Sequence, residues 1–152
     1  MRLTVLAVGR AKAGPEREIW DDYVKRLPWA MTLKEVEAKG NLGAAERMAK
    51  EGALLLDAVP KGATVVGLDG RGQALSSAGF AGRLGKWQDD GVKELALLIG
   101  GADGHGPEVL ARANFLLSLG AMTWPHQLAR VMLAEQLYRA HSILSGHPYH
   151  RA

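Results

Sequence analysis

The chain has 152 residues with 47% apolar and 23% charged residues, which is the composition of an ordinary folded protein. At this length we expect one domain, residues 1–152. The absence of cysteine excludes disulfides, thiolate zinc sites, iron–sulfur clusters and a cysteine nucleophile, and fits a cytoplasmic location. A net charge of +3 suits an anionic partner but is too small to demonstrate one.

No segment suggests a membrane, a leader peptide or a metal site. The apolar run near the start covers only residues 3–8, far short of the ~20 residues that cross a bilayer. The chain contains no His-Glu-x-x-His pattern, so we expect no metal. It also lacks the Gly-x-Ser-x-Gly turn of serine hydrolases.

In chain order, short apolar runs alternate with helical patterns. The runs are continuous, which is typical of parallel strands covered on both faces. We predict strands at residues 3–8, 31–36 (the weakest), 64–68, 94–99 and 114–119. We predict helices at residues 15–27, 41–59, 76–90, 107–113 and 125–145.

Three of these helices carry further expectations. Asn41 is a candidate N-cap for the second helix. Three glycines weaken the third helix. The last helix is expected to pack through an apolar face of Leu128, Val131, Met132, Leu137, Ile143 and Leu144.

The alternation predicts an α/β fold with an open, mainly parallel sheet flanked by helices. In such sheets the ligand lies beyond the carboxyl ends of the strands. Much of the glycine surplus (19 residues) falls in the segments after strands: 9–14, 69–72, 100–107 and 120–126. The segment 100–107 fits neither the Walker A pattern nor G-x-G-x-x-G, so it suggests either a plain tight turn or the wall of a site for an unnamed ligand.

Four of the five histidines lie within the last 27 residues: His126, His141, His147 and His150. The same stretch holds three arginines and a single acid, Glu135. Two interpretations remain open from the residues alone. The end of the chain is either a solvated tail or an RNA-facing segment whose cations contact phosphates and whose Tyr149 stacks on a base.

Three stretches together closely resemble the SPOUT-class methyltransferases of the RlmH family. They are LLIGGADGHGP (97–107), SLGAMTWPHQLARVMLAEQLYRA (118–140) and HPYHRA (147–152). The stretches LTVLAVGRAK and VVGLDGRG are similar to the same family, so the resemblance spans essentially the whole chain.

The resemblance implies a SPOUT fold with a C-terminal trefoil knot, and a homodimer. It implies S-adenosyl-L-methionine as the cofactor and N3 of a pseudouridine as the methylated atom. That pseudouridine lies in helix 69 of 23S rRNA in the assembled 70S ribosome. A SPOUT enzyme acting on another RNA such as tRNA, and a non-enzymatic ribosome-associated factor, are the alternatives.

The resemblance also assigns a cofactor site by matching position. Its residues are Leu68, Gly101, Gly120, Ala121, Met122, Thr123, Trp124 and Pro125. Trp124 departs from the leucine common in the family, and the bland alternative for Trp124 and Met122 is core packing.

The chemistry requires a group that accepts the N3 proton or stabilises the anion. Within a catalytic group of Tyr149, His150 and Arg151, we expect His150 to handle the proton. We expect Arg130, His147, Tyr149 and Arg151 to bind RNA. His126 suits either that chemistry or a capping or dimer contact, and Glu135 suits a structural or interfacial pair.

Overall fold

The computed structural model describes residues 1–151, in which five strands alternate with five helices as predicted. The strands are β1 (Arg2–Val8), β2 (Met31–Val36), β3 (Thr64–Gln73), β4 (Glu94–Ile99) and β5 (Phe115–Leu117). The helices are α1 (Pro15–Arg26), α2 (Ala44–Asp57), α3 (Ser77–Asp89), α4 (Pro107–Arg112) and α5 (His126–Ser145).

The strands form one parallel sheet in the order β2-β1-β4-β3-β5, which confirms the open parallel sheet. The two central strands, β1 and β4, are the most continuously apolar and are buried along nearly their whole length. β2 lies at an edge, and its side chains alternate between half-buried and exposed over its first four residues. The burial of β1, β4 and β2 therefore follows their places in the sheet, whereas β5 is buried at two of its three residues although it lies at an edge.

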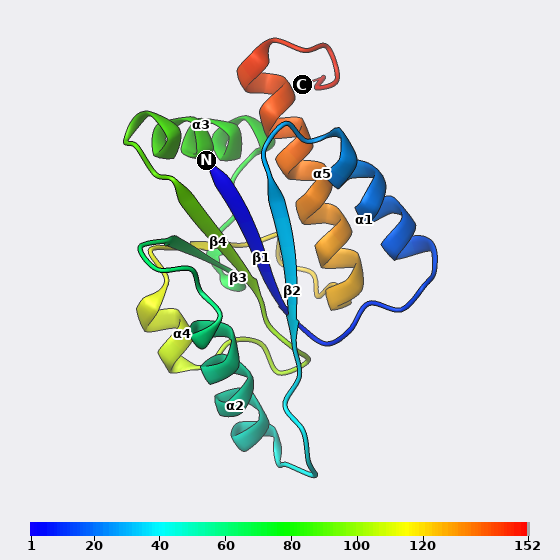
Figure 1. The fold of residues 1–152 in the computed structure, drawn as a ribbon, viewed down its shortest axis with the longest axis vertical. Coiled ribbons are helices and arrows are strands. Elements are labelled where there is room, and N and C mark those ends of the chain that lie inside the picture. The colour runs from blue at the N-terminus through cyan, green and yellow to red at the C-terminus, as the bar shows by residue number, and fades with distance from the viewer. Residues whose placement is uncertain (152) are drawn as a thin grey trace.

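Helices cover both faces of the sheet (Figure 1). α1, α3 and α5 pack together on one face, where they bury the larger apolar cluster. α2 and α4 cover the other face and a smaller cluster. Among residues 1–151 no helix is long and apolar enough to cross a bilayer, and no group of three metal-ligating side chains occurs.

β3 differs from the prediction, because it continues beyond Leu68 to Gln73 where a loop was expected. Gln73 still pairs with Leu117 of β5 after an irregularity in the register. The extension depends on Gly72, where an added Cβ would lie 2.5 Å from the carbonyl carbon and oxygen of Leu116. Only glycine allows two backbones to approach this closely.

The helix over residues 77–89 forms despite its glycines. Its N-cap is Ser76, whose hydroxyl accepts a hydrogen bond from the backbone N–H of Gly79 at 3.0 Å. Gly85 faces α5 so closely that an added Cβ would lie 3.0 Å from a methyl carbon of Leu144. These glycines lower the helix propensity of α3, and Gly85 allows α3 and α5 to pack closely.

Two helix predictions are wrong in detail. Asn41 does not cap α2, which begins three residues later with Gly43 at the N-cap position. α5 packs on the sheet through the fully buried Leu133, Ala134, Leu137 and Ala140, so Leu137 alone of the predicted apolar face is fully buried. The small alanines let α5 lie against its neighbours, which leaves larger side chains such as Leu128 and Leu144 exposed.

Candidate cofactor cleft and C-terminal tail

A cleft of about 700 Å³ opens at the carboxyl ends of β3, β4 and β5. Ligands of open α/β sheets bind at this edge, and the volume lies within the range of small-molecule sites. All eight residues of the predicted cofactor site line the cleft: Leu68, Gly101, Gly120, Ala121, Met122, Thr123, Trp124 and Pro125. They come from three segments far apart in the sequence, and the fold brings them together.

The segment 120–125 forms one wall of the cleft without packing into the core. Gly120 begins it with φ = +112°, a backbone conformation that side-chain-bearing residues avoid. Met122 is 75% exposed and Trp124 42% exposed, which excludes core packing within one protomer. The indole Nε1 of Trp124 donates to the carbonyl of Leu119 at 3.3 Å, so the ring is held over its own loop.

Gly101 follows the end of β4. It lines the cleft, but the position of its missing side chain faces the protein interior. An added Cβ would lie 2.9 Å from both carboxylate oxygens of Glu51 and 3.1 Å from a methyl carbon of Val8. A side chain at position 101 would therefore press against α2 and β1. Glu51 is buried, and burial raises the pKa of its carboxyl group.

The extension of β3 brings two further polar residues, Asp69 and Arg71, to the cleft. Arg71 forms a bidentate ion pair with Asp69, with contacts of 2.8 Å from both Nε and Nη2. These contacts lower the pKa of Asp69. The Nη2 atom of Arg71 also donates to the carbonyl of His105.

His105 is buried and neutral. Its Nε2 donates to the carbonyl of Leu98 at 3.0 Å, and burial lowers the pKa of the ring. No signal in the sequence indicated the burial of Glu51. Asp69 and Arg71 lie in the segment 69–72 and His105 lies in the segment 100–107, which the sequence marked as following strands, but their individual contacts were not predicted.

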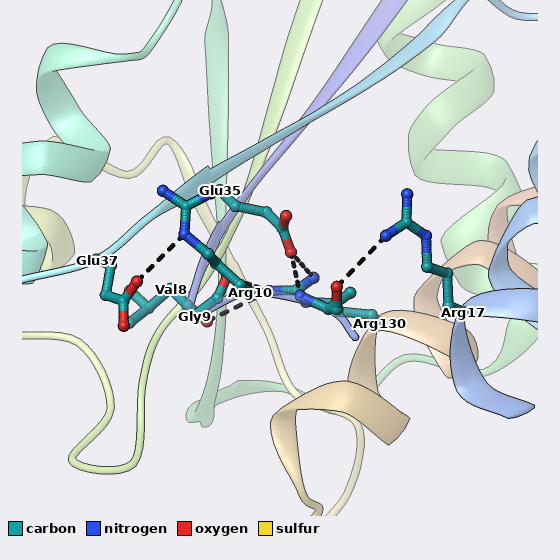
Figure 2. A network of polar contacts seen from close by, with 8 residues as sticks. Val8, Gly9, Arg10, Arg17, Glu35, Glu37 and Arg130 are labelled. Carbon is teal, nitrogen blue, oxygen red and sulfur yellow. Dashed lines mark hydrogen bonds and ion pairs between the residues drawn. The ribbon is translucent and has the colours of Figure 1, made fainter. Parts of the chain in front are cut away.

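Arg130, expected to bind RNA, is 2% exposed and forms an internal network instead (Figure 2). Its guanidinium donates to Glu35 at 2.6 Å and to the carbonyls of Val8 and Gly9 at 3.3 and 2.9 Å. Glu35 also accepts from the backbone N–H of Ala11 at 2.6 Å. This corrects the prediction: the group expected to meet phosphate joins β1, β2 and the first turns of α5.

The pKa of the Glu35 carboxyl group is lower than its ordinary value. Burial by itself raises that pKa, but the hydrogen bonds from Arg130 and Ala11 outweigh it. The contacts therefore favour the charged form of Glu35, whereas the buried Nε of Arg130 has no hydrogen-bond partner within the described part of the chain.

His126 begins α5 at the rim of the cleft, where it is half-buried. Its imidazole Nε2 lies 3.9 Å from the position of a Cβ added to Gly9. No side chain caps this end of α5, so the capping alternative for His126 is wrong. Its place on the cleft wall fits the chemical alternative.

The tail after α5 folds back on the helix and is held by an aromatic cluster. The ring of Tyr149 packs edge-on against Tyr138, with centroids 4.8 Å apart. Its hydroxyl contacts the hydroxyl of Tyr23 at 3.1 Å and donates to Glu135 at 3.2 Å. Arg26 lies over the Tyr138 ring at 4.3 Å. Tyr149 therefore anchors the tail, and stacking of its ring on a base stays a prediction.

An ion pair on α5 also contacts the tail. Arg139 pairs with Glu135 at 2.7 Å, which confirms the expectation that Glu135 is paired. Arg139 also lies 3.1 Å from Nδ1 of His150. His147 and Arg151 are exposed, and Nδ1 of His147 accepts a hydrogen bond from the backbone N–H of Tyr149 at 3.2 Å.

The cleft and the tail lie at opposite ends of α5. The helix has 20 residues, which corresponds to a length of about 30 Å. Figure 1 shows the C-terminus and the start of α5 at opposite ends of this helix. Within one protomer, the predicted catalytic group Tyr149, His150 and Arg151 is therefore remote from the predicted cofactor residues.

A second hollow of about 470 Å³ extends between α1, α3 and α5. Its walls are largely apolar and include Ile19, Phe80, Val131 and Met132. Leu117, Leu119 and Gly120 line both this groove and the cleft, so the two hollows adjoin. At its other side the groove includes Tyr23 and Glu135, which hold the tail.

Comparisons with known proteins give a consistent family. The family model described as "Predicted SPOUT methyltransferase" matches residues 1–150. The ribosomal RNA large subunit methyltransferase H of Paramagnetospirillum magneticum is 56% identical over 151 residues, covering 99% of each chain. The protein of the same name from Rhodospirillum centenum is 56% identical over 152 residues, covering 100% of each.

Among solved structures, the SpoU methyltransferase AviRb of Streptomyces viridochromogenes aligns with 95% of this chain at 14% identity and a TM-score of 0.49. This chain spans 61% of the AviRb chain. The whole-length family match shows that the chain belongs to the SPOUT methyltransferase family, with relatives named ribosomal RNA large subunit methyltransferase H.

Proposed function

We propose that this protein is an S-adenosylmethionine-dependent methyltransferase of large-subunit ribosomal RNA. Its target in this proposal is N3 of a pseudouridine in helix 69 of 23S rRNA, in the assembled 70S ribosome. One observation carries the proposal: the eight residues matched to the family's cofactor contacts line a single cleft at the carboxyl edge of the sheet.

The residues of the cleft fit the cofactor. Leu68 and Trp124 offer apolar surfaces for the two faces of an adenine, and the backbone at 101 and 120–125 offers donors and acceptors for its edge. When bound, the cofactor supplies an electrophilic methyl group. The task of the protein is to align N3 with the carbon–sulfur bond of that methyl group.

The distance between cleft and tail favours a homodimer in which each tail serves the cleft of the other copy. A two-fold axis across the middle of α5 brings the tail of one copy to the cleft of its partner. The apolar groove between α1, α3 and α5 lies between the two regions and suits such an interface. The homodimer, and the trefoil knot implied by the family, are parts of this proposal.

Two exposed side chains suit contacts with RNA. His147 and Arg151 flank the anchored Tyr149, so the anchor holds both near the end of α5. Arginine binds phosphate through charge-assisted hydrogen bonds, and an imidazole N–H can also donate to phosphate. We expect Arg151→Ala to weaken RNA binding while the affinity for S-adenosylmethionine stays within about twofold, since position 151 is remote from the cleft of its own protomer.

The test uses radiolabelled S-adenosylmethionine and 70S ribosomes that contain the pseudouridine but lack its methyl group. Methyl transfer to 23S rRNA, mapped to N3, supports the proposal. No transfer, with calorimetry showing cofactor binding, refutes the substrate. Transfer to tRNA instead indicates another RNA, and absence of cofactor binding indicates a non-enzymatic factor.

A mixed dimer tests the sharing of sites. One copy carries Arg151→Ala in the tail, and the other carries Gly120→Val in the cleft, where φ = +112° disfavours a β-branched residue. The Gly120→Val homodimer is expected to be inactive and the Arg151→Ala homodimer to be strongly impaired, whereas co-expressed mixed dimers should regain about a quarter to a half of the wild-type activity. If a verified mixed dimer recovers no activity, the tail of one copy does not complete the active site of the other.

A further inference from the structure

The contact between Arg139 and His150 fixes which ring nitrogen of the histidine carries the proton. Nη1 of Arg139 lies 3.1 Å from Nδ1 of His150. A guanidinium has donors and no acceptor, so Nδ1 must be the acceptor of this hydrogen bond. A neutral imidazole carries one N–H, which is then on Nε2.

Arg139 is itself held firmly enough to impose this choice. Its Nε and Nη2 atoms donate to Oε1 of Glu135 at 2.8 and 2.7 Å. Its guanidinium carbon lies 4.9 Å from the centre of the Tyr149 ring, which belongs to the same tail. The guanidinium of Arg139 therefore contacts the Glu135 carboxylate through Nε and Nη2, the Tyr149 ring through its face, and His150 through Nη1. A proton on Nδ1 would set two donors against each other and break this contact.

These contacts make His150 a poor proton acceptor. The one lone pair of the neutral ring that could take a proton already accepts from Arg139. The other nitrogen presents an N–H, which can only donate. The expectation that His150 accepts the N3 proton thus conflicts with the geometry of the tail.

We propose that His150 serves the methyl transfer as a neutral donor: its Nε2–H binds a carbonyl oxygen next to the reacting nitrogen, and Arg139 is the positioning residue that sets this tautomer. The inference rests on the proposed function, because the acceptor is the target base. An imide nitrogen has a carbonyl on each side, and both oxygens gain negative charge when the N–H bond breaks. A donor placed at such an oxygen stabilises the anion.

The step balances without a base on the protein. The N3–H bond breaks and the proton passes to solvent water or hydroxide, which leaves an electron pair on N3. That pair forms the bond to the methyl carbon while the carbon–sulfur bond breaks, and S-adenosylhomocysteine leaves as a neutral thioether.

The tautomer can be measured without any activity. The protein is labelled with ¹⁵N-histidine, and two-bond ¹H–¹⁵N correlations are recorded at a pH where the ring is neutral. His150→Gln assigns the signal among the five histidines. The expected pattern is a protonated Nε2 and an unprotonated Nδ1 for His150, changing to a mixture in Arg139→Leu. A protonated Nδ1 in the wild-type protein overturns the inference.

Kinetics then separate a donor from a base. His150→Ala is expected to lower the single-turnover rate about 100-fold, which is typical for loss of one donor to a developing oxyanion. His150→Gln, whose side-chain amide also donates but cannot act as a base, should recover at least tenfold of that loss. Arg139→Lys keeps a donor toward Nδ1 and should exceed Arg139→Leu by about tenfold. Equal rates for the glutamine and alanine variants overturn the donor role.

Lys86→Leu is the matched control, because Lys86 forms an i,i+4 ion pair with Asp90 on α3 just as Arg139 does with Glu135 on α5. Its rate should match that of the wild type, and all variants should retain wild-type cofactor affinity.

The pH profile gives an independent arm. With His150 as a donor, the single-turnover rate rises with pH beyond neutrality as the imide ionises. A plateau above pH ~6.5 that is lost in His150→Gln indicates a histidine base and overturns the inference.

The outcomes also distinguish this inference from the proposed function. If the protein methylates no RNA, the proposed function fails and the catalytic role of His150 fails with it, while the NMR result still decides the tautomer. If methylation proceeds and His150→Ala has the wild-type rate, only the inference is refuted.

Discussion

Arg130→Met removes the centre of the buried network between β1, β2 and α5, and the expected cost can be worked from the contacts. Methionine fills a similar volume but leaves Glu35 without its ionic partner and the carbonyls of Val8 and Gly9 without a donor. Removing one partner of a buried pair costs about 3–5 kcal/mol. Because the Glu35 side chain keeps 21% exposure, we expect the lower end, about 3 kcal/mol.

The assay is urea unfolding, with thermal unfolding as a check. A loss of about 3 kcal/mol in a domain of this size lowers the Tm by about 6–12 °C. Glu35→Gln and the double variant complete a cycle, in which the double variant should cost less than the two single ones together by about 0.5–3 kcal/mol. Additive losses, or a loss below about 0.5 kcal/mol for Arg130→Met, would refute the account of Arg130.

The same pair predicts a pH dependence with a definite sign. The pKa of Glu35 is lowered in the folded state, so the unfolded state binds the proton more tightly. The stabilisation is present above the unfolded pKa of about 4.3 and is lost as the pH falls through the lower folded value. Glu35→Gln should remove this part of the acid sensitivity.

Three other predictions concern distinct parts of the fold. The pKa of His105 is lowered in the folded state, so its contribution to stability is lost as the pH falls below about 6.5. The unfolding free energy of His105→Gln, measured in urea, should depend less on pH below that value, since glutamine can still donate to the carbonyl of Leu98. Gly72→Ala should destabilise the protein by about 2 kcal/mol or more, because the added methyl meets the backbone of Leu116; equal urea midpoints for variant and wild type would contradict the observed approach of β3 and β5. Met132→Glu places a charge in the apolar groove and should convert the proposed homodimer to monomers in sedimentation velocity, whereas Lys86→Leu should leave the oligomeric state as it is.

The regular elements and their order could be predicted from the sequence, because each depends on a local pattern. Continuous apolar runs identified β1 and β4, and the position of glycines after the strands indicated the edge where the cleft lies. The prediction that Asn41 caps α2 was wrong, because residues that can cap a helix are common and this helix begins three residues later.

The contacts within the sites could not be predicted, because they join segments distant in sequence. Arg130 meets Glu35 across 95 residues, and nothing in its own neighbourhood distinguishes it from an RNA-binding arginine. Tyr149 meets Tyr23 across 126 residues, so its anchoring role has no local signature. The resemblance to a family supplied the cofactor residues, but it did not show that the tail and the cleft lie at opposite ends of α5.

The length of α5 fixes the separation between the cleft and the tail. Each inserted residue would lengthen the helix by about 1.5 Å and rotate everything beyond it by about 100°. One insertion in the middle of α5 would therefore turn the tail away from Tyr23, and a four-residue insertion would nearly restore its direction while moving it by about 6 Å. If the tail of each copy lies at the cleft of the other, a change in the length of α5 displaces the tail at both clefts. The spacing between the HQLAR and HPYHR segments therefore sets both the distance and the direction of the tail relative to the cleft.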